Sequence, residues 1–96
     1  METEKVAREI LEFSHRDQVI PRYMVDSLAA YVADHRPVGD FLTAVLSNNL
    51  RDAVMTADEV NADKLSVYIS YLYCLAPSQC WGSPEKVTEW CSYVRE

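Results

Sequence analysis

The sequence predicts an all-α protein, a compact array of five or six short helices in a single domain spanning residues 1–96. Apolar side chains recur at spacings of three and four residues in several segments, and no segment alternates polar and apolar residues for long. Only two glycines occur, fewer than the turns of a β-rich fold of this size need. Of the 96 residues, 49% are hydrophobic, which allows one modest core and argues against disorder.

The first half of the chain predicts three helices. Thr3 can cap a helix that runs to about residue 14, and residues 15–20 form a connection. Pro21 suits the first turn of a second helix, which should end near Asp34 because a proline follows shortly afterwards. Asp40 is a credible N-cap for a third helix.

The second half begins with Asn48 and Asn49, which separate the third helix from a short fourth helix starting at Leu50. A longer fifth helix is expected from a cap at Asp58 or Asn61. Its predicted buried stripe is Leu65, Tyr68, Ile69, Leu72 and Leu75.

Pro77 ends this fifth helix, and a loop that carries Trp81 follows it. Ser83 and Pro84 then have the cap and first-turn chemistry of a sixth helix. Its apolar stripe is Val87, Trp90, Cys91 and Val94. Across the whole chain the predicted core is Leu28, Phe41, Leu42, Leu46, Leu65, Ile69, Leu72 and Trp90.

The sequence contains no nucleophile, phosphate-loop or metal-ligand motif, so we expect neither an enzyme nor a metal or cofactor site. Cys74, Cys80 and Cys91 match no zinc spacing, and they cannot all pair within one chain. Reduced thiols are the simplest interpretation. A Cys80–Cys91 disulfide and an intermolecular bridge remain open.

The charge balance favours a basic partner. Nine lysines and arginines against fifteen acids give a net charge of −6, which does not favour direct nucleic-acid binding. Four of the acids form a run that is either a solvated face or a docking surface: Asp52, Asp58, Glu59 and Asp63.

Aromatic residues near the acidic run offer further contact candidates. Tyr71 and Tyr73 cannot both share the stripe of Tyr68, so at least one of them should reach solvent, where aromatic residues favour interfaces. Trp81 either closes the core as a plug or anchors a partner.

Four short motifs stand in a distinctive order: IPxxM at residues 20–24, PxGDFLxAVLxN at 37–48, ADxxN at 57–61 and APxxxWGS at 76–83. In this succession the chain resembles a family of small uncharacterised proteins of tailed phages and prophages. The resemblance covers about residues 20–90 and leaves residues 1–15 outside it, as an elaboration of the family-like core. It implies a phage accessory protein acting in the cytoplasm of a host bacterium, and no particular activity.

The leading hypothesis is therefore a protein that binds a host protein and inhibits or redirects it, with anti-defence action as one form. One alternative is an oligomeric sponge for a nucleotide signal, to which Arg16, Arg22 and Tyr23 would contribute. Another is a structural or assembly factor of the virion. We also expect self-association, most simply as a dimer through the first helix, and no membrane span.

Overall fold

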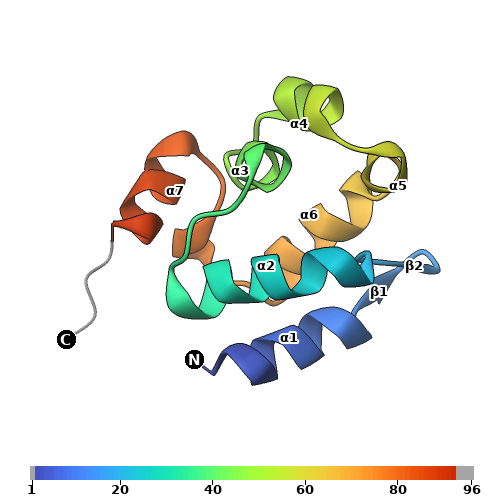
Figure 1. Cartoon of the computed structure of the whole chain (residues 1–96), viewed down its shortest axis with the longest axis horizontal. Helices are drawn as coiled ribbons and strands as arrows, with labels where there is room; N and C mark the ends of the chain where they lie inside the picture. Colours follow the sequence, from blue (N-terminus) through green and yellow to red (C-terminus); the bar gives the residue numbers. More distant parts are fainter. Residues whose placement is uncertain (1, 93–96) are drawn as a thin grey trace.

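Helices account for most of the chain in the computed structural model, which describes residues 2–92 (Figure 1). Seven α-helices lie within these residues: α1 (Thr3–Glu12), α2 (Arg22–Asp34), α3 (Asp40–Leu46), α4 (Leu50–Thr56), α5 (Glu59–Ala62), α6 (Leu65–Cys74) and α7 (Pro84–Cys91). A short 3-10 turn, η1 (Ser78–Cys80), precedes α7, and two strands of two residues each, β1 (Ser14–His15) and β2 (Gln18–Val19), form a hairpin. The prediction of an all-α fold is confirmed.

The helices form one globule with extents of 38 × 27 × 20 Å. Figure 1 shows α1 lying beside α2, α3 beside α4, and α5 and α7 at opposite ends of the molecule. The short helix α3 is central, because five of its seven residues are buried. Val6 and Ile10 of α1, one helical turn apart, belong to the same core. The apolar side of the first helix is therefore used within the chain itself.

Three helices begin with a side-chain cap, two of them at the predicted caps Asp58 and Ser83. The side-chain oxygens of Asn49, Asp58 and Ser83 accept hydrogen bonds from backbone N–H groups at the starts of α4, α5 and α7. Thr3 and Asp40 are instead the first residues of α1 and α3, and each helix begins without a side-chain cap. The two predicted caps were therefore one residue too late.

The predicted fifth helix is two helices in the structure. Asp63 and Lys64 separate α5 from α6, and this break gives seven α-helices in residues 2–92 where five or six were expected. Asp63 follows the last residue of α5 with φ −94° and ψ 5°, so the backbone leaves helical geometry there.

The buried face of α6 differs from the predicted stripe. Tyr68 and Leu72 are buried as expected, but Val67 and Tyr71 complete the face, while Ile69 is 37% exposed and Leu75 is also exposed. The assignment of Ile69 to the core was wrong. Val67 and Tyr71 take the place expected for Ile69 and Leu75, while the buried hydroxyl of Tyr68 donates to Asn61.

The rest of the predicted core is largely confirmed. Leu28, Phe41, Leu42, Leu46 and Leu72 are buried, whereas Leu65 and Trp90 are half-buried and pack against the core. Val94 of the predicted last stripe lies outside the described residues.

The segment expected as a connection contains the small hairpin. Arg16 and Asp17 at its tip both have left-handed backbone geometry, with φ of 53° and 63°, as a two-residue turn of this kind requires. His15 contacts α6 through a 3.1 Å hydrogen bond between its Nδ1 atom and the hydroxyl of Ser70.

Backbone and side-chain hydrogen bonds hold the C-terminal segment against the helices. The N–H of Gly82 donates to the carbonyl of Leu46 at 2.7 Å, and φ of 116° at Gly82 explains why glycine is needed there. The indole Nε1–H of Trp90 donates to the carbonyl of Tyr31 at 2.6 Å, which joins α7 to α2.

Candidate functional site

Asp58 is placed by a contact that the sequence did not reveal. One of its carboxylate oxygens accepts from the backbone N–H of Asn61 at 2.7 Å, and the other accepts from the hydroxyl of Tyr23 on α2. The hydrogen bond from Tyr23, with the backbone N–H of Asn61, holds the pKa of Asp58 below its usual range. The same bond raises the pKa of Tyr23. Asp58 is therefore ionised at neutral pH and fixed at the junction of α2 and α5.

Beneath this pair lies Asn61, the one buried polar residue among the described residues, with 2% of its surface exposed. Its Oδ1 atom accepts from the hydroxyl of Tyr68 at 2.7 Å, and its Nδ2 atom lies 3.5 Å from the hydroxyl of Tyr23. A polar network that connects α2, α5 and α6 is thus formed by Tyr23, Asp58, Asn61 and Tyr68. Because its buried members are already paired, it acts as a structural link.

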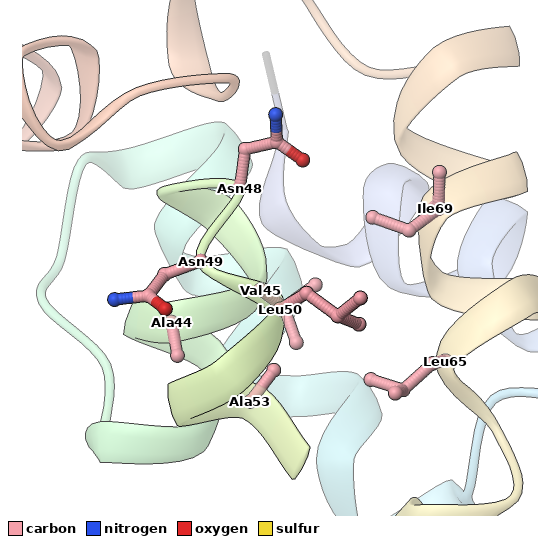
Figure 2. A pocket seen from close by; sticks show the side chains of 8 residues that line it. All are labelled: Ala44, Val45, Asn48, Asn49, Leu50, Ala53, Leu65 and Ile69. Carbon is pink, nitrogen blue, oxygen red and sulfur yellow. The ribbon is translucent and has the colours of Figure 1, made fainter.

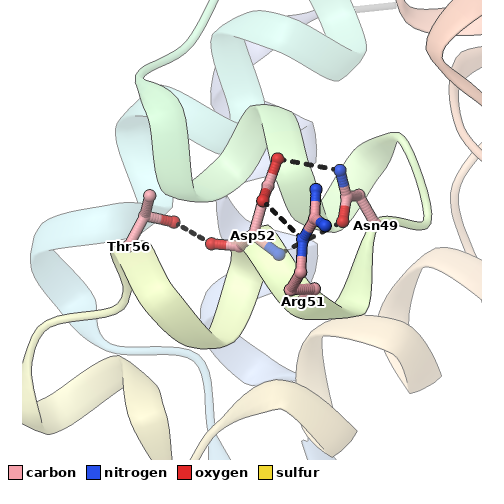
Figure 3. A network of polar contacts seen from close by, with 4 residues as sticks. All are labelled: Asn49, Arg51, Asp52 and Thr56. Carbon is pink, nitrogen blue, oxygen red and sulfur yellow. Dashed lines mark hydrogen bonds and ion pairs between the residues drawn. The ribbon is translucent and has the colours of Figure 1, made fainter.

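Asp52 sits in a separate network at the start of α4 (Figure 3). Its carboxylate accepts from Asn49 Nδ2 at 2.9 Å and from Arg51 Nε at 3.3 Å, and the hydroxyl of Thr56 donates to its carbonyl at 2.6 Å. Its own N–H donates to Asn49 Oδ1 at 3.1 Å. These contacts give Asp52 a role in starting the helix, and Arg51 offsets part of its charge.

The other acids stand together with exposed apolar side chains, a combination missed at the sequence level. Glu59 and Asp63 are exposed at the two ends of α5, Val60 between them is half exposed, and Met55 in the last turn of α4 is 78% exposed. Tyr23 is also largely exposed. We refer to this group as the acidic corner: Tyr23, Met55, Asp58, Glu59, Val60 and Asp63.

The tyrosines expected beside the acidic run lie elsewhere. Tyr73 is 82% exposed and Tyr71 is 2% exposed, so the prediction that one of them reaches solvent is confirmed and the residue is Tyr73. Tyr71 belongs to the core and packs edge-to-face on Phe13 with ring centroids 5.8 Å apart. Trp81 is half-buried, packs against the core and lines a shallow hollow together with Tyr73 and Lys86.

An apolar pocket of about 150 Å³ opens between α4 and α6 (Figure 2). Leu50 on one side and Leu65 and Ile69 on the other line it, and Asn48 lies at one end of this group, as the close-up shows. Leu50 is 69% exposed although it lies directly beside the core residue Ala53. The pocket thus presents an apolar surface to solvent, and Tyr73, one helical turn after Ile69 on α6, lines a different hollow.

Among residues 2–92 no group of three or more histidine, cysteine or acidic side chains has the arrangement of a metal site. The three cysteines are free thiols, of which Cys74 is exposed and Cys80 is buried. Burial raises the pKa of Cys80 to about 12 and also raises that of Cys91. A thiol with the pKa of Cys80 is protonated at neutral pH and is a poor nucleophile there.

None of the comparisons with protein-family models, curated proteins and solved structures gives a match. Within the described part of the chain, no helix is long and apolar enough to cross a bilayer. Two exposed surfaces are therefore the candidates for a functional role, the acidic corner and the pocket between α4 and α6.

Proposed function

We propose that this chain is a phage accessory protein that binds a basic surface of a host bacterial protein and inhibits or redirects it. Interference with a host defence complex is one form of this function. The phage setting follows from the resemblance in residues 20–90. The binding function is supported mainly by one observation, the exposed acidic corner.

The acidic corner combines charged and apolar side chains. Asp58 is held ionised by Tyr23, and the carboxylates of Glu59 and Asp63 make no hydrogen bond or ion pair with other described residues. Met55 and Val60, which are exposed close to these acids in the chain, provide apolar surface, and methionine adapts to varied partner shapes. Complementary charge would speed the encounter with a basic partner, while the apolar side chains would slow dissociation.

A nucleotide sponge has less support. Tyr23, one of the three residues considered for it, donates its hydroxyl to a carboxylate, which would repel a phosphate placed beside it. Arg16 lies at the hairpin tip, and Arg22 lines a different hollow together with Arg8 and Asp26. The acidic corner therefore supports a protein partner better than an anionic ligand.

The test starts with affinity capture of the tagged protein from host lysate and identification of the retained protein by mass spectrometry. Association rates are then measured at low and moderate salt for a Glu59→Lys/Asp63→Lys variant. The matched control is Glu4→Lys/Glu85→Lys, which changes the net charge equally at exposed first-turn acids of α1 and α7.

We expect the corner variant to associate more slowly at low salt and to lose most of its salt dependence, and the control to change little. Met55→Ala should raise the dissociation rate. Equal effects of the two charge variants would show that only net charge matters and would contradict binding at the acidic corner.

A further inference from the structure

A second surface, distinct from the acidic corner, lies along α6. No charged residue occurs between Lys64 and Glu85, although a quarter of the whole chain is charged. Part of this uncharged stretch is exposed, with Ser66, Ile69 and Tyr73 on the outer side of α6. Depletion of charge together with an exposed aromatic residue is typical of the centre of a protein interface.

Leu65, Ile69 and Tyr73 follow one another at intervals of four residues, so they lie on nearly the same face of α6, about 6 Å apart along its axis. The first two line the apolar pocket, and the third projects into solvent beyond it. This face therefore carries a cavity at one end and a protruding aromatic side chain at the other.

We propose that the occupant of the pocket is Tyr73 of a second copy of this chain. If two α6 helices pack antiparallel about a twofold axis near Ile69, Tyr73 of each copy lies level with Leu65 of the other. Each copy then gives one ring and receives one, as an interface with twofold symmetry requires. The proposal is independent of the proposed host-binding function.

The size and chemistry of the pocket fit this occupant. Its volume of about 150 Å³ equals that of an apolar cavity that accepts a benzene ring. Leu50, Leu65 and Ile69 would contact the ring, and the amide of Asn48, which also lines the pocket, offers an acceptor for the tyrosine hydroxyl.

Electrostatics also favours a second copy on this face. Two molecules with a net charge of −6 repel each other, and an uncharged contact face keeps the acids apart. A second copy can therefore approach along the stretch between Lys64 and Glu85 without placing acids against acids.

The contact is small. A fully covered tyrosine buries about 150–250 Å². Two of them, with the exposed parts of Leu50 and Ile69, stay below the roughly 1,600 Å² of a standard interface. We therefore expect a reversible dimer with a dissociation constant in the micromolar range.

Sedimentation equilibrium over a concentration series of the full chain tests the proposal. Tyr73→Ala and Leu50→Asp each change an exposed residue, and both should weaken the dimer at least about tenfold. Met55→Ala is the matched control, since Met55 is equally exposed but lies outside the pocket. Far-ultraviolet circular dichroism checks that each variant is folded.

A photoreactive amino acid at position 73 adds a direct test of the occupant. Crosslinks to the peptide of another copy that carries Leu50 or Leu65 would support the pairing. A chain that stays monomeric at high micromolar concentration, a dimer that survives Tyr73→Ala, or crosslinks to residues of α1 would each overturn it. Saturable binding of free phenol by a monomeric chain would assign the pocket to a small ligand and would also overturn it.

Discussion

Replacing Tyr68 with phenylalanine should destabilise the fold by about 1–3 kcal/mol. The substitution removes one hydroxyl and leaves the ring, which packs edge-to-face on Phe41 with centroids 5.4 Å apart. What is lost is the 2.7 Å hydrogen bond to Asn61 Oδ1. Because Asn61 is 2% exposed, water does not reach its oxygen easily, and the buried acceptor is left unpaired.

Urea denaturation followed by circular dichroism gives the free energy of unfolding, and the same loss should appear as a decrease in Tm of ~4–8 °C per kcal/mol. Tyr73→Phe is the matched control. It removes the same hydroxyl from a residue that is 82% exposed, so it should change stability by less than about 0.5 kcal/mol.

A double-mutant cycle separates the hydrogen bond from other effects. Asn61→Leu removes the acceptor, and Tyr68→Phe in that background should cost much less than in the wild type, because no buried acceptor remains. If Tyr68→Phe and Tyr73→Phe have the same effect, the polar network does not contribute to stability and the reasoning is refuted.

The buried face of α6 and its tyrosines give two more predictions. Leu72→Ala should cost about 2–5 kcal/mol and Ile69→Ala clearly less, because Leu72 is fully buried and Ile69 is not; urea denaturation of both variants decides this. Burial raises the pKa of four groups in the folded state: Tyr31, Tyr68, Tyr71 and Cys80. Their contribution to the stability of the fold is complete below the pKa values of the unfolded chain, about 8.5 for cysteine and about 10 for tyrosine. This contribution is lost as the pH rises further. An alkaline titration followed by tyrosinate absorbance and circular dichroism should therefore show these tyrosines ionising together with unfolding, and ionisation in a chain that stays folded would contradict the prediction.

The helices could be predicted from local chemistry. Ser83 followed by Pro84 fixes the start of α7, and Asn49 starts α4, because capping depends on residues within one turn. The break between α5 and α6 could not be predicted in the same way. Asp63 and Lys64 are compatible with a helix interior, and no proline or glycine marks the break between the two helices.

The candidate surfaces could be predicted less well from the sequence than the helices. Asp58 was recognised as a cap, but Tyr23 lies 35 residues away in the chain, and no local pattern indicates that they meet. The apolar residues of α6 fit more than one helical face. The predicted stripe included Ile69, whereas tertiary packing buries Val67 and Tyr71 and leaves Ile69 exposed.

The two surfaces depend on different forces, and this separates their roles in solution. Binding at the acidic corner gains from charge attraction, which salt screens over about 8 Å at physiological ionic strength. Contact along α6 buries apolar side chains between two copies that each carry a net charge of −6, so salt removes a repulsion there. Raising the salt concentration should therefore weaken binding to a basic partner and leave the dimer unchanged or tighter. If acidic residues lay at the dimer contact, added salt would tighten the dimer much more steeply. If ion pairs joined the two copies, added salt would dissociate the dimer.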